Sequence, residues 1–189
     1  MKNIAIFASV SGTNAENLIK FFRTSPFGRV QIVLSNRADA GVLGRAQSLD
    51  IESFVFNREQ FYNSEDVLEV LLERHIDFIV LAGFLWLVPD YLLQTFENKI
   101  VNIHPALLPK YGGKGMYGSH VHRAVIEAGD PESGISIHYV NARYDEGDII
   151  FQARCDIAPG ETPDSLAGKV HELEYAHFPG VVEGLLKQL

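Results

Sequence analysis

The chain has 189 residues, a mass of 21.0 kDa and a net charge of -8 at pH 7. This length suits one domain with a well-filled core. The acidic balance excludes an extended nucleic-acid-binding face, which needs basic residues to neutralise phosphates. A single cysteine, Cys155, excludes an internal disulfide and indicates a reducing compartment. No run approaches the ~20 apolar residues of a membrane span and no signal peptide pattern occurs, so we expect a cytoplasmic protein.

The first half of the chain alternates short apolar runs with helical patterns. Lys2–Ala8 predicts a strand that leads through a glycine-bearing turn into a helix, where Thr13 and Glu16 fit a capping box and Asn14 is an alternative cap. The backbone N–H groups after Gly12 form either an anion site or an ordinary capped helix start. The next runs predict two strands and two helices, in the order Val30–Leu34, Ala40–Leu49, Phe54–Phe56 and Ser64–Arg74.

The segment Phe78–Ala82 lacks polar alternation, which is typical of a central parallel strand covered on both faces. The residues after it, Phe84–Val88, are too apolar for a plain surface loop. They either pack against a helix beginning near Pro89 or line a pocket for a flat aromatic ligand. Arg58 lies in an earlier polar loop, where we expect it to be solvated.

Polar side chains end the next predicted strand, in the stretch K-I-V-N-I-H-P-A-L-L-P. Asn102 and His104 are two residues apart just before Pro105, which cannot donate to a sheet, so both side chains point to one side of the strand end. Ligands bind at the carboxyl rim of parallel α/β sheets. The pair is therefore a candidate site, with a structural histidine as the alternative.

The loop after this strand, residues 109–122, is rich in glycine and aromatic residues and predicts a mobile lid. His120 and His122 lie in it, but no third ligand occurs at a usual spacing, so we expect no metal site. A helix is predicted over Val121–Glu127.

The last third of the chain predicts a pair of strands and a long helix. The strands cover residues 134–140, with His138 inside, and a segment from Ile149. Asp145 lies between them, as a turn former or a site residue. The final helix begins at Thr162 and places His171 and Glu174 on one face.

These elements predict one α/β domain over residues 1–189. We expect a mostly parallel twisted sheet of about seven strands flanked by helices. Its N-terminal half is Rossmann-like, and residues 134–157 add antiparallel strands at one edge.

Several sequence motifs occur together from Ile4 to about Pro179. The motif N-I-H-P-x-L-L-P precedes D-x-G before a strand, and the chain also contains S-G-T-N, L-A-G-F and H-E-L-E-Y-A-H-F-P. This combination resembles the folate-dependent formyltransferases, in particular members that act on a phosphorylated ribotide. Trp86 replaces a common arginine of that family and Ala106 a common serine, and the glycine-rich loop is longer than usual.

The resemblance implies transfer of the formyl group of 10-formyltetrahydrofolate to the amine of glycinamide ribonucleotide in purine biosynthesis. It implies that residues 1–100 form the phosphate- and ribotide-binding half and residues 101–189 the catalytic and folate-binding half. Both partners are then small molecules, without nucleic acid, membrane or metal, and the protein is a monomer or homodimer. The implied catalytic residues are Asn102, His104 and Asp145; the ribotide residues are Gly12, Thr13, Asn14, His171 and Glu174; and the folate residues are Arg58, Leu85, Trp86, Leu87, Val88 and Asn102.

The chemistry implied by this resemblance is direct acyl transfer. We expect Asp145 to raise the pKa of His104 by stabilising its charged form. The amide N–H of Asn102 and the protonated imidazole would stabilise a negatively charged oxygen. The alternatives are a formyltetrahydrofolate hydrolase, a methionyl-tRNA formyltransferase, which would need a basic surface, a non-catalytic folate- or nucleotide-binding module, and a dehydrogenase, for which the full glycine fingerprint is missing.

Overall fold

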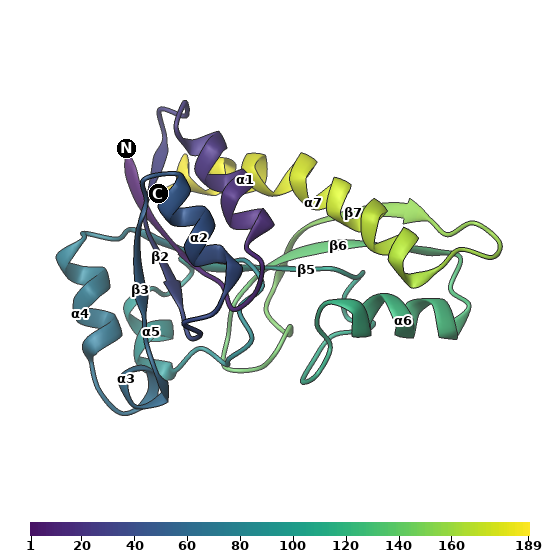
Figure 1. The fold of residues 1–189 in the computed structure, drawn as a ribbon, viewed down its shortest axis with the longest axis horizontal. Helices are drawn as coiled ribbons and strands as arrows, with labels where there is room; N and C mark the ends of the chain where they lie inside the picture. Colours follow the sequence, from purple (N-terminus) through teal and green to yellow (C-terminus); the bar gives the residue numbers. More distant parts are fainter.

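Seven strands form one continuous sheet in the order β3-β2-β1-β4-β5-β6-β7 (Figure 1). The computed structural model describes all of residues 1–189. Neighbouring strands from β3 to β5 are parallel, and β6 and β7 extend the sheet in antiparallel fashion. The predicted α/β fold with antiparallel edge strands is confirmed. The strands are β1 Lys2–Phe7, β2 Gly28–Ser35, β3 Glu52–Val55, β4 Phe78–Leu81, β5 Ile100–His104, β6 Glu132–Tyr139 and β7 Ile149–Asp156.

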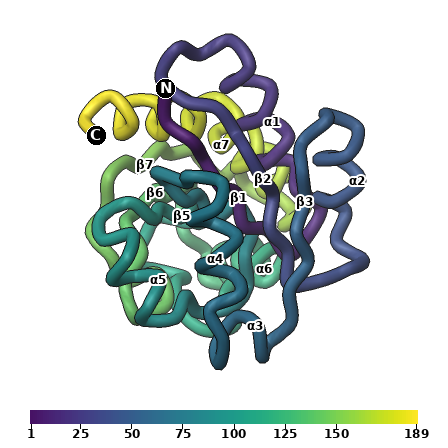
Figure 2. The backbone as a smooth tube through the Cα atoms, turned by 90° about the vertical axis from the view of Figure 1, so that its left-hand side faces the viewer, coloured from purple at the N-terminus to yellow at the C-terminus, as the bar shows by residue number.

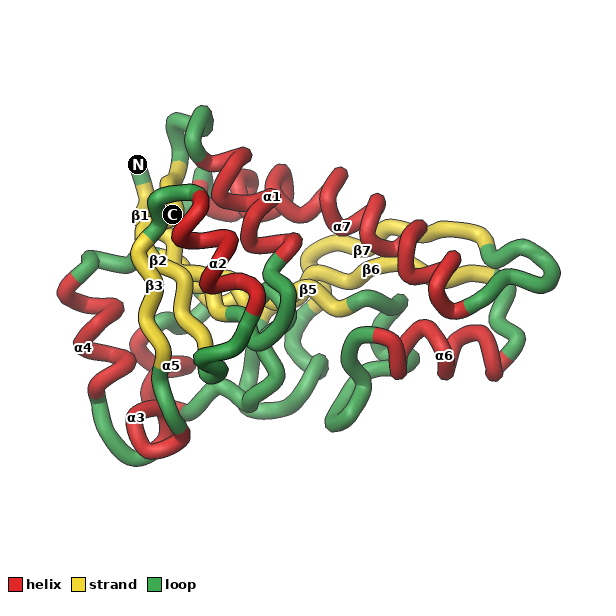
Figure 3. Tube along the Cα trace, viewed as in Figure 1, coloured by secondary structure: helices red, strands yellow, loops and turns green.

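Helices cover both faces of the sheet, as the red segments of Figure 3 show. The view in Figure 2 places α7 above the strands and α3 and α5 below them. No helix is both long and apolar enough to cross a membrane. The helices are α1 Thr13–Phe22, α2 Gly41–Ser48, α3 Arg58–Tyr62, α4 Asp66–Glu73, α5 Asp90–Thr95, α6 Ser119–Ala128 and α7 Pro163–Leu186.

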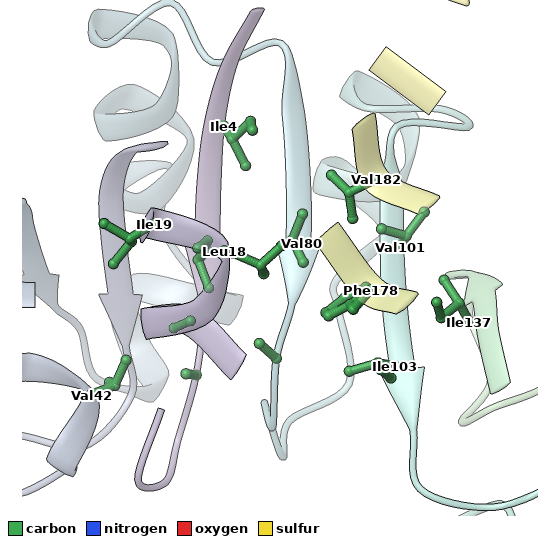
Figure 4. Close-up of a cluster of buried hydrophobic side chains, with 14 of the residues drawn as sticks. Ile4, Leu18, Ile19, Val42, Val80, Val101, Ile103, Ile137, Phe178 and Val182 are labelled. Carbon is green, nitrogen blue, oxygen red and sulfur yellow. The ribbon is translucent and has the colours of Figure 1, made fainter. Parts of the chain in front are cut away.

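One face of the sheet packs against α1, α2, α6 and α7. Side chains alternate along β1, so Ile4 and Ile6 face this layer while Ala5 and Phe7 face the other. Burying each large aliphatic side chain contributes about 1.5–3 kcal/mol. Figure 4 shows this core, which includes Ile4, Leu18, Ile19, Val42, Val80, Val101, Ile103, Ile137, Phe178 and Val182.

The opposite face packs against α3, α4 and α5 and is rich in aromatic rings. Phe7 and Phe56 lie 5.9 Å apart between ring centroids, and Phe61 stacks on Phe56 at 4.9 Å. Trp86 packs on the edge of this cluster, and Val88 is buried in the same core. Part of the apolar segment after β4 therefore packs in the same core as Leu92 of the helix that follows Pro89, which is one of the two interpretations of the sequence.

Two local predictions are wrong. The expected capping box of Thr13 and Glu16 does not form: Gly12 is the N-cap of α1, in a left-handed conformation (φ 77°), and no side chain caps the helix. Glu16 pairs with Lys20 and Arg45 instead. Arg58 is the first residue of α3 and does not lie in a loop. A capping box between Asn57 and Gln60 stabilises the start of this helix.

The strand order reverses between β1 and β4. The chain leaves β1 toward α1 on one face and leaves β4 toward α5 on the other, which opens a crevice at the carboxyl ends of the strands. Ser9 holds the two diverging loops together: its N–H donates to the Gly83 carbonyl at 2.9 Å, and its Oγ accepts the Leu85 N–H at 3.0 Å. The fold thus positions a ligand site at this point.

Candidate active site

The crevice continues into a cavity of about 480 Å³, within the range usual for small-molecule sites. Its walls come from the ends of β1, β4 and β5, the loop before α6, the turn between β6 and β7, and α7. Both halves of the chain therefore contribute. The predicted site residues that line it are Gly12, Thr13, Asn14, Leu85, Asn102, His104, Asp145, His171 and Glu174.

Asn102, His104 and Asp145 meet on one wall of this cavity. The Nδ1 atom of His104 lies 3.6 Å from Oδ2 of Asp145. The amide nitrogen of Asn102 lies 3.4 Å from the other oxygen of that carboxylate, a long hydrogen bond. Two residues at the end of β5 and one from a distant turn are thus brought together.

His104 is almost fully buried, at 3% exposure. Its Nε2 donates to the main-chain carbonyl of Tyr111 at 2.7 Å, since a carbonyl can only accept. The ring proton of the neutral imidazole therefore lies on Nε2, and Nδ1 carries a free lone pair facing Asp145.

The pKa of His104 is lowered from its usual value, contrary to the sequence-based expectation. Burial disfavours the imidazolium and outweighs the carboxylate of Asp145 and the carbonyl of Tyr111, which both favour it. His104 is consequently neutral at pH 7 and able to accept a proton.

Asp145 lies in the turn between β6 and β7 with a positive φ of 55°. Burial alone would raise the pKa of its carboxyl group. His138, the charge interaction with His104 and the N–H of Gly113, which donates at 2.9 Å, outweigh burial, and the pKa is lowered. The carboxylate is therefore ionised at neutral pH.

His138 belongs to the same cluster, although sequence reasoning gave it no role in the site. Its Nδ1 donates to the Tyr139 carbonyl, which leaves Nε2 to accept from the Asn102 amide at 3.1 Å. The same Nε2 lies 3.6 Å from Asp145. The signal that identifies His138 is the strand register, because Asn102 pairs directly with it across the antiparallel β5–β6 ladder.

The other end of the cavity combines a helix start with a buried carboxylate. Gly12, Thr13 and Asn14 begin α1, whose first N–H groups have no partner within the helix. Asn14 donates to Glu174 at 2.8 Å, and its own side-chain oxygen is buried without a partner. Burial raises the pKa of Glu174, and His171 lies 4.0 Å from its carboxylate. These groups suit a ligand with a phosphate and hydroxyl donors.

Four predicted folate residues do not line the cavity. The guanidinium of Arg58 lies 4.8 Å from the ring centroid of Trp86 and 5.8 Å from that of Tyr62. The carbonyl of Leu87 accepts the hydroxyl of Tyr62 at 2.9 Å, and Val88 is buried. Arg58, Trp86, Leu87 and Val88 thus lie outside the cavity lining, and Arg58 and Trp86 pack at the edge of the aromatic cluster.

Further lining residues come from the glycine-rich segment that the sequence predicts to be a lid. The loop before α6 contributes Gly113, Lys114, Met116 and Tyr117. His122, which follows in α6, is 3% exposed and its Nδ1 has no partner. The structure holds no group of three His, Cys, Asp or Glu side chains placed to bind a metal ion.

The fold and this cavity define an α/β protein with a small-molecule site at the carboxyl ends of its strands, and comparison with known proteins names its family. A family model described as formyl transferase matches residues 2–182, and the chain belongs to this family.

Similar proteins match this chain over nearly its whole length. It is 37% identical to phosphoribosylglycinamide formyltransferase of Haemophilus influenzae, over 97% of this chain and 86% of that protein. It is also 37% identical to the chloroplastic enzyme of that name from Arabidopsis thaliana, where the match covers 99% of this chain but 66% of the plant protein. A crystal structure of phosphoribosylglycinamide formyltransferase from Streptococcus pneumoniae superposes with a TM-score of 0.85 at 37% identity, over 98% of this chain and 99% of that one.

Proposed function

We propose that this chain transfers the formyl group of 10-formyltetrahydrofolate to the amine of phosphoribosylglycinamide, also called glycinamide ribonucleotide, in purine biosynthesis. The relatives named for this activity match the chain at about 37% identity along nearly its full length. The observation that carries the proposal is the meeting of His104, Asn102 and Asp145 on the wall of a cavity whose other end suits a ribotide.

We assign to His104 the proton transfers of the reaction. The neutral amine attacks the formyl carbon, a new C–N bond forms, and the amine proton passes to Nδ1 of His104. The bond from the formyl carbon to the folate nitrogen then breaks, and the proton passes from His104 to that nitrogen. Asp145, ionised and 3.6 Å away, stabilises the imidazolium between the two steps.

Asn102 is the proposed donor to the negative oxygen of the tetrahedral intermediate. One of its amide hydrogens is held by His138, and the other makes only the 3.4 Å contact with Asp145. That second hydrogen is available to an oxyanion. Removing one such donor typically slows acyl transfer by about 100- to 1000-fold.

The ribotide is placed at the start of α1. The N–H groups of Gly12, Thr13 and Asn14 suit the 5-phosphate, because a helix N-terminus favours negative charge. The ribose hydroxyls suit Glu174, with His171 beside it, and the unpartnered oxygen of Asn14 can accept a further hydrogen bond.

The folate is placed along the segment after β4. Phe84 and Leu85 line the cavity and offer an apolar surface to a flat pterin. The main chain of Leu85, Trp86, Leu87 and Val88 is the proposed source of polar contacts, and of these four residues only Leu85 lines the cavity itself. Arg58, stacked on Trp86, forms no ion pair within the chain. We also propose a cytoplasmic monomer or homodimer, without metal, for which the lone Cys155 fits a reducing compartment.

The test is to mix the purified protein with 10-formyltetrahydrofolate, with and without glycinamide ribonucleotide, and to follow deformylation spectroscopically. Turnover that depends on the ribotide, with one formylated product per folate consumed, supports the transferase. Formate release at the same rate without ribotide would assign a hydrolase, and tight binding without turnover would assign a non-catalytic binding protein.

A further inference from the structure

The main chain of Tyr111–Gly113 contacts two of the proposed catalytic side chains at once. The Tyr111 carbonyl accepts from Nε2 of His104 at 2.7 Å, and the Gly113 N–H donates to Oδ2 of Asp145 at 2.9 Å. A Cβ added to Gly112 between them would lie 2.6 Å from a methyl group of Leu108 and 3.2 Å from Cβ of Asp145, so a side chain there would force its neighbours to shift. This segment is therefore closely fitted against the catalytic wall.

The Tyr111 backbone has a conformation that an ordinary residue adopts only under constraint. Its φ is 56°, in the left-handed region. A non-glycine residue persists there only when its surroundings hold it. The conformation directs the carbonyl toward His104, so whatever holds it also holds the imidazole.

The constraint lies outside the substrate cavity. The phenol of Tyr111 donates to Oδ2 of Asp130 at 2.8 Å, and Lys110 donates to the same oxygen at 3.0 Å. Tyr111 and Asp130 line a separate cavity of about 370 Å³ and do not line the site described above. Neither residue is therefore placed to touch substrate.

We propose that Tyr111 is a positioning residue, whose phenol, held by Asp130, keeps its own carbonyl against Nε2 of His104. The carbonyl fixes the imidazole in the tautomer with hydrogen on Nε2, and Nδ1 stays free for the proton transfers. The catalytic consequence rests on the proposed function, whereas the tautomer does not.

Tyr111→Phe removes the hydroxyl and keeps the ring. We expect kcat for formyl transfer to fall about tenfold, less than the ~100-fold cost of misplacing a reacting group by 1 Å. The KM values for both substrates should remain unchanged, because the substrate cavity keeps its lining. A rise in KM at unchanged kcat would overturn the proposal.

Asp130 supplies a matched pair of variants, which also carry the test if Tyr111→Phe fails to fold. Asp130→Asn keeps an oxygen that accepts from the phenol and should retain most of the wild-type kcat, whereas Asp130→Ala should lose about tenfold, as Tyr111→Phe does. Combining Tyr111→Phe with Asp130→Ala should cost no more than either change alone. Lys110→Met, which breaks only the ion pair, is the control and should keep the wild-type rate.

The direct readout is the ¹⁵N spectrum of the His104 imidazole without substrates, at neutral to slightly alkaline pH, assigned by its loss in His104→Ala. We expect one tautomer with hydrogen on Nε2 in the wild type and in Asp130→Asn, and a mixture of tautomers in Tyr111→Phe and Asp130→Ala. An unchanged tautomer in those last two variants would overturn the positioning role even if the enzyme is active. If the two variants change the tautomer but the wild-type protein shows no transferase activity, the positioning role stands and the proposed function is refuted.

Discussion

At the scale of single residues, the site depends on two titratable groups, one charged and one neutral, whose states are set by their surroundings. The pKa of the Asp145 carboxyl group is lowered in spite of its burial, and the Gly113 N–H donates to the carboxylate. His104 is kept neutral by burial in spite of Asp145. A base that is neutral and a carboxylate that is charged are the states that proton transfer from an amine requires.

Replacing Asp145 by Asn tests this arrangement. The variant keeps the shape of the side chain but cannot stabilise an imidazolium, so kcat should fall about 100- to 1000-fold while substrate binding is retained. Steady-state kinetics check this, with the exposed Asp148→Asn in the same turn as the control. A large loss of binding at unchanged kcat would instead assign Asp145 to substrate binding.

A substitution of Glu174 tests the proposed ribotide-binding end of the cavity. Glu174→Gln replaces a buried carboxyl oxygen by an amide nitrogen, and leaving a buried hydrogen-bonding group without its partner costs about 1–3 kcal/mol. The KM for the ribotide should rise about 10- to 100-fold, with the KM for the folate unchanged. Glu172→Gln, on an exposed position of α7, should leave both values as they are. Equal rises in both KM values would argue against a contact with the ribotide.

At the scale of elements, the antiparallel addition of β6 brings His138 and Asp145 to the end of β5. The pairing is close: a Cβ added to Gly134 on β6 would lie 1.9 Å from the carbonyl oxygen of Ala153 on β7. By contrast, a Cβ added to Gly168 in α7 would meet nothing within 4 Å. Close strand packing therefore requires a glycine at position 134, whereas no neighbouring atom requires one at position 168.

Alanine substitutions at these two positions test whether only Gly134 is required by packing. Gly134→Ala should destabilise the protein by about 1–3 kcal/mol, because the strands must move apart. Gly168→Ala should be neutral or stabilise by about 0.5–1 kcal/mol, because alanine is the better helix former. Urea unfolding measures both. Equal stability of Gly134→Ala and the wild type would contradict the close packing of β6 and β7.

The sequence predicts the elements that repeat a pattern over many residues. The unbroken apolar run of β4 identifies a central strand, and Pro105 correctly marks where β5 ends. One short element is not predicted. Helix α3 has five residues, too few to show a helical period. The capping box at Thr13 fails because Gly12 is the N-cap, which places Thr13 inside the first turn, and Glu16 pairs with Lys20 and Arg45.

The same division applies to the site. Asn102 and His104 are recognisable because a strand must end beside them, whereas Asp145 resembles any turn residue and stands out only through the family motif. His138 needs the strand register, which the sequence does not contain. The direction of the His104 pKa depends on how deeply the fold buries the ring, and the sequence-based expectation was wrong for that reason.

At the scale of the whole molecule, burying a histidine without a partner couples stability to pH. His122 is 3% exposed in α6, and burial, together with the neighbouring His171 and His104, lowers its pKa from 6.5 to about 4. Between those pH values the unfolded chain binds more protons than the folded one. The free energy of unfolding contributed by this group is fully present above pH 6.5 and is lost as the pH falls toward about 4.

The loss amounts to about 3 kcal/mol over that interval. His122→Gln cannot titrate, so its unfolding free energy should change less with pH than that of the wild type. Urea unfolding at several pH values measures the difference, with the exposed His120→Gln as a control that keeps the wild-type dependence. Parallel curves for the wild type and His122→Gln would show that the histidine is protonated equally in both states.

The account depends most directly on His104 as the group that moves the proton. The decisive measurement is the rate of ribotide-dependent formyl transfer by His104→Ala, alongside its circular dichroism and urea unfolding. We expect a folded protein whose kcat is reduced at least about 1000-fold. Turnover close to the wild-type rate by the folded variant would contradict the role of His104 and, with it, the proposed mechanism.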